Sequence, residues 1–71
     1  MGFDKVRMGK ILRELRGDRS LADVAKKVGV SASAMSMYES GDRVPRDQVK
    51  LALAEYYDRP VSFIFFGEES H

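Results

Sequence analysis

The 71-residue chain contains no cysteine and a single histidine, at position 71. Disulfides and thiolate metal sites are therefore excluded, and the residues for a His-rich metal cluster or a catalytic triad are missing. His71 is expected to be an end residue and not a ligand. No apolar run approaches the roughly 20 residues needed to cross a membrane, and the first residues lack the apolar core of a signal peptide. We therefore expect a cytoplasmic protein with no cofactor, no metal and no membrane partner.

The chain is also short of the features on which enzymes depend. Its length is near the lower limit for a core without disulfides or metal, and leaves little surface for a deep pocket. The carboxylates are scattered, and Gly17, Gly29 and Gly41 stand at expected helix ends, not in a phosphate-binding loop. We expect one small domain over residues 1–71, without enzymatic activity.

The net charge is only +1, but it is unevenly distributed. Among residues 1–19, six cations stand against three carboxylates, whereas Glu68 and Glu69 add two negative charges near the end of the chain. The basic part can face phosphates and the acidic part solvent. Charge alone is equally compatible with an ordinary solvated helix.

Residues 20–41 predict two short helices joined by a tight turn, around which the other elements are organised. Ser20 and Ser31 have the side chains of N-caps, and Gly41 can end the second helix in a left-handed conformation. Between Ser20 and Gly29, apolar residues recur at helical spacing: Leu21, Val24, Ala25 and Val28. A turn centred on Gly29 is typical of the helix-turn-helix arrangement, whose second helix commonly enters the major groove of DNA.

Three further helices are expected. Periodicity predicts a first helix from Lys5 to Arg16 and a fourth from Asp47 to Tyr57, which Pro45 separates from the preceding helix. The segment 60–66 is ambiguous, because Pro60 suits the start of a helix whereas the β-branched and aromatic residues suit a strand. We favour a helix, since nothing else in the chain resembles a pairing strand.

Two sequence patterns carry a family resemblance. The first is G-x-x-L-R-x-L-R, from Gly9 to Arg16, and the second is S-L-x-x-V-A-x-x-V-G-V-S-x-S-x-M-S-x-Y-E-x-G-x-R-x-P, from Ser20 to Pro45. With the later L-A-x-Y-Y and I-F-F elements, the chain resembles the Cro/repressor-type helix-turn-helix family, also called the XRE family. The resemblance implies an all-α, compact five-helix bundle of the lambda-repressor-like type, with the helix-turn-helix formed by helices 2 and 3. It also implies binding to operator DNA, usually as a two-fold dimer on a palindromic site.

The second helix of the motif presents small residues to DNA if Met35 and Tyr38 face the core. By this geometry and by the resemblance, the base-facing residues are Ala32, Ser33, Ser36, Met37 and Ser40. Serine reads bases weakly, alanine and methionine can pack on a thymine methyl group, and none of these makes a bidentate base contact. Many family members have Gln or another long polar residue where Leu21, Ala32 and Met37 stand. We therefore expect weakened base readout without loss of backbone binding.

Phosphate contacts are expected at helix starts and in one loop. The expected residues are Ser20, Leu21, Ser31, Arg43 and Arg46, with Leu21 unable to clamp a phosphate through its side chain. Arg16 and Glu39 resemble a structural ion pair of the family that ties the first helix to the third, so we assign them to the fold.

The aromatic residues of segment 60–66 are too many for one short helix to bury. Ile64 is expected in the core, while Phe63, Phe65 and Phe66 are the expected dimer contact or a site for a protein partner. The alternative is that the rings pack back onto the first and fourth helices.

These features predict a small DNA-binding transcriptional regulator, a repressor of bacterial or phage type that occludes a promoter as a dimer. The alternative is a protein-interaction module or antitoxin-like adaptor with weakened base readout. The modest chemistry of the predicted recognition helix favours the alternative, whereas Arg43 and Arg46 favour DNA.

Overall fold

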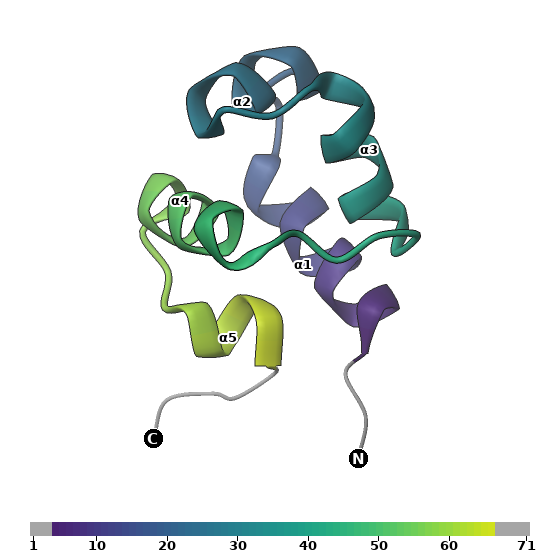
Figure 1. The fold of residues 1–71 in the computed structure, drawn as a ribbon, viewed down its shortest axis with the longest axis vertical. Coiled ribbons are helices and arrows are strands. Elements are labelled where there is room, and N and C mark those ends of the chain that lie inside the picture. Colours follow the sequence, from purple (N-terminus) through teal and green to yellow (C-terminus); the bar gives the residue numbers. More distant parts are fainter. Residues whose placement is uncertain (1–3, 67–71) are drawn as a thin grey trace.

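The computed structural model describes residues 4–66, which fold into five α-helices without a strand among them (Figure 1). The helices are α1 (Lys5–Arg16), α2 (Leu21–Val28), α3 (Ala32–Ser40), α4 (Asp47–Tyr57) and α5 (Val61–Phe66). The all-α, five-helix prediction is confirmed. Within residues 4–66, no helix has both the length and the apolar character needed to cross a membrane. Glu68, Glu69 and His71, on which the sequence also carried predictions, lie outside the described residues.

Local sequence signals begin and end the helices. The side chains of Asp4, Ser20 and Ser31 each accept a hydrogen bond of 3.0 Å from the backbone N–H three residues later. These bonds satisfy N–H groups that have no partner inside the helix. Gly29 ends α2 with φ at 81°, a left-handed conformation that a β-carbon disfavours. The turn between α2 and α3 is therefore encoded by its own residues.

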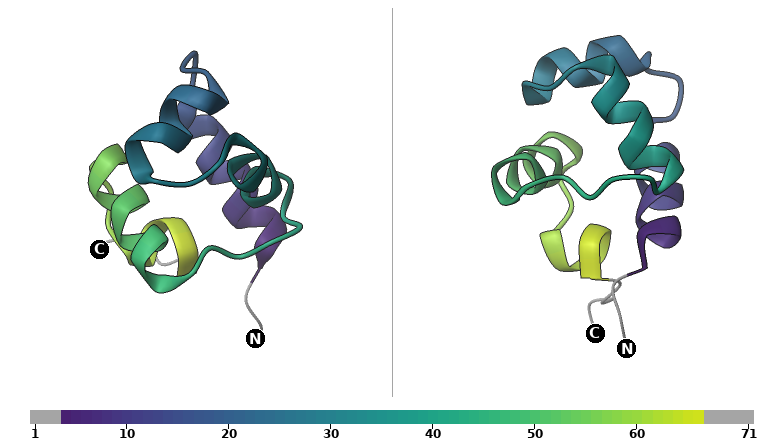
Figure 2. Two further views of the ribbon diagram at one scale, coloured as in Figure 1. Left: turned by 45° about the horizontal axis from the view of Figure 1, so that its top comes forward. Right: turned by 45° about the vertical axis from the view of Figure 1, so that its right-hand side comes forward.

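The five helices enclose one apolar core. α1 packs on α3 and α5, α2 packs on α3 and α4, and α4 packs on α5. The side chains buried between them are Met8, Leu12, Val24, Ala25, Met35, Tyr38, Leu53, Ala54, Tyr57, Ile64 and Phe65. In Figures 1 and 2, α2 lies at one end of the molecule, and the start of α1 lies beside the end of α5 at the other. α2 and the end of α5 therefore lie at opposite ends, whereas the end of α3 reaches the start of α1 (Figure 1).

α1 and α3 approach each other closely where Gly9 meets the end of α3. A β-carbon at Gly9 would collide with the carbonyl oxygen of Glu39 and would lie 2.8 Å from its carbonyl carbon. Because backbone atoms cannot turn aside as a flexible side chain can, the missing side chain sets the distance between α1 and α3.

The ambiguous segment is a helix, and it divides its aromatic residues between core and surface. Ile64 and Phe65 are 1% and 2% exposed, whereas Phe66 is 57% exposed and Phe63 is half-buried. The prediction that Phe65 belongs to a dimer contact is wrong, because its ring fills the core. The ammonium of Lys50 lies 5.8 Å from the centre of the Phe65 ring.

Candidate nucleic-acid interface

One face of α3 is free of contacts with the rest of the fold and carries no charge. Ala32, Ser33 and Ser36 are exposed, while Met35 and Tyr38 are buried against the core. The exposed residues form a low surface without a long side chain. Such a surface allows the helix to approach a groove closely, and it offers two serine hydroxyls as its hydrogen-bonding groups.

The end of this face is less available than its start. Ser40 Oγ lies 3.1 Å from the carbonyl oxygen of Met37 and 2.9 Å from Asp42 Oδ2, so its proton is used within the turn that follows α3. The Met37 side chain is half-buried, with part of its surface accessible beside Ser36. Two of the residues predicted to face bases are therefore less available: the hydroxyl proton of Ser40 is hydrogen-bonded within the turn, and the Met37 side chain is half-buried.

The serines that begin the two helices of the motif have two roles available. Ser20 Oγ and Ser31 Oγ already accept backbone hydrogen bonds, but both side chains are exposed and each hydroxyl keeps a proton to donate. Leu21 is half-buried and packs against the core. Only its backbone at the start of α2 is therefore suited to an anion.

The loop between α3 and α4 holds two arginines on either side of a buried proline. Arg43 and Arg46 are exposed, whereas Pro45 is buried and Val44 is half-buried. Arg46 is the N-cap of α4 but makes no side-chain cap bond, and its carbonyl oxygen accepts from the N–H of Val49, so the N–H groups of Asp47 and Gln48 remain for an anion. The exposed Arg43 and Arg46 give this loop two positive charges suited to phosphate, beside the exposed carboxylates of Asp42 and Asp47.

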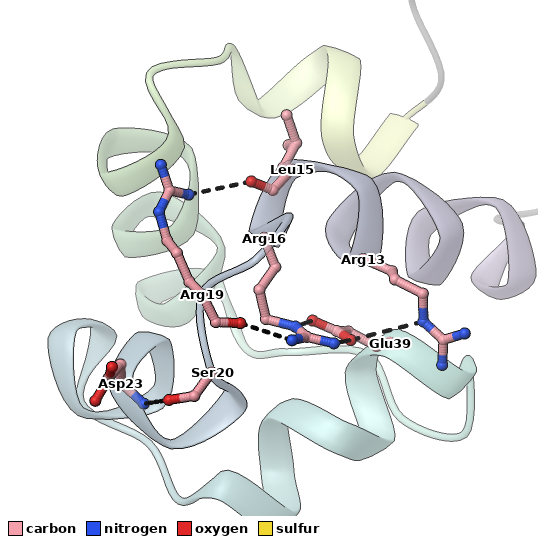
Figure 3. Close-up of polar contacts among 7 residues, drawn as sticks. All are labelled: Arg13, Leu15, Arg16, Arg19, Ser20, Asp23 and Glu39. Carbon is pink, nitrogen blue, oxygen red and sulfur yellow. Dashed lines mark hydrogen bonds and ion pairs between the residues drawn. The ribbon is translucent and has the colours of Figure 1, made fainter.

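Arg16 and Glu39 form the ion pair expected from the sequence (Figure 3). Arg16 Nε donates to Glu39 Oε2 at 2.7 Å, and Arg16 Nη2 donates to Oε1 at 3.0 Å, a bidentate arrangement. The hydrogen bond to Glu39 raises the pKa of Arg16 further above its ordinary value. The side chain of Glu39 is 2% exposed and that of Arg16 is 19% exposed, so the pair joins α1 to α3 beneath the surface.

A second arginine, Arg19, occupies a position that the sequence did not predict. Its guanidinium carbon lies 5.4 Å from the centre of the Tyr56 ring and 5.7 Å from that of Tyr57. Arg19 Nη1 also donates to the carbonyl oxygen of Leu15 at 3.1 Å (Figure 3). In the sequence, Arg19 stands directly before the N-cap serine of α2, and the two tyrosines are adjacent to each other in α4. Their contact could not be predicted from these positions, because it depends on the packing of α2 on α4.

Leu51 is another surface residue that sequence reasoning missed. It is 63% exposed on α4, next to Lys50, whose ammonium lies 5.4 Å from the centre of the Phe66 ring. A usable signal was present, because Leu51 falls outside the apolar stripe of its helix.

Among residues 4–66, no three His, Asp or Glu side chains are grouped so that they could hold a metal ion.

Residues 7–62 match the family described as a helix-turn-helix domain. A solved structure with the same architecture is that of the P22 c2 repressor protein in complex with synthetic operator 9T in the presence of Tl+. The two chains share 28% sequence identity with a TM-score of 0.82, over 86% of this chain and 96% of the repressor chain. The fold is therefore lambda-repressor-like. None of the curated protein sequences is significantly similar to this chain.

Proposed function

Because the chain belongs to the helix-turn-helix domain family, with a Cro/repressor-type motif, we propose that it is a sequence-specific DNA-binding transcriptional regulator. The observation that carries the proposal is the similarity over 86% of the chain to a repressor in complex with an operator. In this proposal α3 enters the major groove of double-stranded DNA. The protein acts as a repressor in the cytoplasm, where its bound form excludes polymerase from a promoter.

Base readout in this proposal rests on few groups. Ser33 and Ser36 supply single hydrogen bonds, while Ala32 and the accessible part of Met37 pack on thymine methyl groups. The hydroxyl proton of Ser40 is already hydrogen-bonded in the turn after α3, so Ser40 contributes to the shape of the surface and not to hydrogen bonds with bases. Since none of these residues makes a bidentate base contact, part of the specificity comes from DNA shape and deformability.

Backbone contacts supply most of the affinity. Arg43, Arg46 and the N–H groups at the start of α4 bind one phosphate region, and Ser20 with the start of α2 binds another. Ser31 adds a hydroxyl at the start of α3. These groups place the protein on the duplex in a fixed register, which single-serine base contacts could not do by themselves.

A dimer on a palindromic operator is part of this proposal, and exposed apolar residues on α1, α4 and α5 support it. Phe66 and Leu51 are 57% and 63% exposed on neighbouring helices, and Val6 is 60% exposed at the start of α1, which packs on α5. An exposed apolar patch of this kind supports self-association. Phe63, half-buried on α5, lies at the margin of this dimer contact.

The alternative function is a protein-interaction module, such as an antitoxin-like adaptor, that uses the same end of α5. The observation in its favour is that α3 contains no Arg, Lys, Asn or Gln, the residues that read bases most strongly. The two functions differ in whether Arg43 and Arg46 contact phosphate.

Fluorescence anisotropy with labelled duplex DNA distinguishes the two functions. Arg43→Ala should weaken binding and lower the slope of log affinity against log salt by about 0.9, the value for one lost phosphate contact. Arg59→Ala removes the same charge from an exposed residue that follows α4 and should leave the slope unchanged. Equal slopes for both variants would contradict phosphate binding by Arg43.

A further inference from the structure

A basic cleft lies between α2 and α4. It has a volume of about 670 Å³, and its lining residues are Arg19, Asp23, Lys26, Lys27 and Tyr56. Three cations and one carboxylate give it a formal charge of +2. In Figure 3, the Arg19 side chain extends from the segment before α2 toward α4, and Asp23 lies on α2 next to Ser20.

The cations of this cleft are available to a partner. Lys26 and Lys27 are exposed, and neither forms an ion pair within residues 4–66. Both lie in the last turn of α2, three and four residues after Asp23, so each is a neighbour of Asp23 on the helix surface. They do not serve the fold, and no polar contact holds them in place.

Arg19, in contrast, is fixed before any partner arrives. Its guanidinium stacks over Tyr56 and Tyr57 and donates to the carbonyl oxygen of Leu15. The carbonyl oxygen of Arg19 in turn accepts a 2.7 Å hydrogen bond from Arg16 Nη1. A preorganised guanidinium loses little conformational freedom when a carboxylate binds it. The half-buried Tyr56 ring supplies an apolar wall beside it.

From this cleft we infer a docking surface for an acidic protein segment, which lies across α2 and places carboxylates on Lys26, Lys27 and Arg19. The charge of the cleft complements such a segment, and Tyr56 accommodates an apolar residue among the carboxylates. The site is open to solvent, which suits a chain segment better than an enclosed small molecule. None of its lining residues belongs to α3.

The inference can be tested by NMR titration of the ¹⁵N-labelled full chain with a short peptide that alternates glutamate and phenylalanine. The amide signals of Lys26, Lys27 and Tyr56 should shift, and Lys26→Glu/Lys27→Glu should weaken binding by about tenfold, from two lost ion pairs and two new repulsions. The matched control, Lys5→Glu/Lys10→Glu, changes the charge equally on exposed positions of α1. It should retain most of the affinity.

Two outcomes would overturn the inference. These are equal weakening by both double variants, and peptide-induced shifts confined to α3 and the loop that follows it. Neither outcome involves DNA, so the inference and the proposed function can fail separately.

Discussion

At the scale of single residues, Glu39 connects α3 to α1. It is the one charged residue that the described part of the chain buries, and Arg16 meets it with two hydrogen bonds. Arg13 Nε lies farther away, at 3.9 Å, on a side chain that is 71% exposed. A buried charge is tolerated when its partner is present and is costly when that partner is removed.

Glu39→Ala should therefore lower the free energy of unfolding by about 3 kcal/mol, since Arg16 loses both hydrogen bonds. Arg16→Ala should cost more, because it leaves the carboxylate buried whereas Arg16 can reach solvent. Chemical denaturation of both variants measures the two values. An unchanged melting temperature for Glu39→Ala would show that the pair does not stabilise the fold.

Tyr57 makes stability depend on pH in the alkaline range. Burial raises the pKa of Tyr57 to about 12, and the nearby Glu39 carboxylate adds to this effect. The neutral form is therefore favoured in the folded state, and its contribution is fully present below the ordinary tyrosine pKa of about 10. As pH rises from about 10 to about 12, the unfolded chain ionises first and stability falls by about 2 kcal/mol.

Tyr57→Phe isolates this effect from other groups that titrate at high pH. Tyr57 Oη is buried without a hydrogen-bond partner among residues 4–66, so removing it should leave neutral-pH stability unchanged or raise it by about 1 kcal/mol. Urea unfolding from pH 9 to 12 should show a smaller loss of stability in the variant than in the parent chain. Parallel curves would mean that Tyr57 keeps an ordinary pKa.

At the scale of the elements, the contact between α1 and α3 depends on Gly9. Alanine at an interior helix position normally adds up to about 1 kcal/mol of stability relative to glycine. Here its β-carbon would meet the backbone of Glu39, so Gly9→Ala should instead destabilise the fold by roughly 2 kcal/mol. Lys10→Ala, at an exposed position of the same helix, is the control. A more stable Gly9→Ala variant would show that α3 can move away without penalty.

The helix boundaries could be predicted because their signals are local. The bounds expected for α1 and α4 are those observed, and Ser20, Gly29 and Ser31 mark the helix ends where the sequence placed them. Whether segment 60–66 forms a helix or a strand could not be decided locally. Its six-residue helix is too short for a clear apolar period, and contact with α1 and α4 stabilises it.

The candidate interface could be predicted in composition but less well in detail. Periodicity was sufficient to place Ser33 and Ser36 on the outer face of α3. It could not reveal that Ser40 bonds to Asp42, that Phe65 fills the core, or that Arg19 stacks on two tyrosines. Each of these contacts depends on how side chains pack in three dimensions, which the spacing of residues in the sequence does not specify.

At the scale of the whole molecule, the large apolar residues that the described part of the chain exposes are Val6, Leu51 and Phe66, and the proposed dimer uses Leu51 and Phe66 on the neighbouring helices α4 and α5. Sedimentation should show association that Phe66→Ala/Leu51→Ala weakens by at least about tenfold, from the loss of two buried apolar side chains. Val30→Ala, at a half-buried position in the turn between α2 and α3, is the control. Only monomer at high micromolar concentration would rule out this dimer.

The central claim is that the chain binds DNA and reads its sequence through α3. The most direct test is anisotropy-monitored binding to a pool of random duplexes, at low and physiological salt, followed by selection of enriched sites. We expect binding that weakens with salt and enrichment of a palindrome whose half-sites lie about one helical turn, ~34 Å, apart. Absence of binding even at low salt would contradict the claim and favour the protein-interaction function.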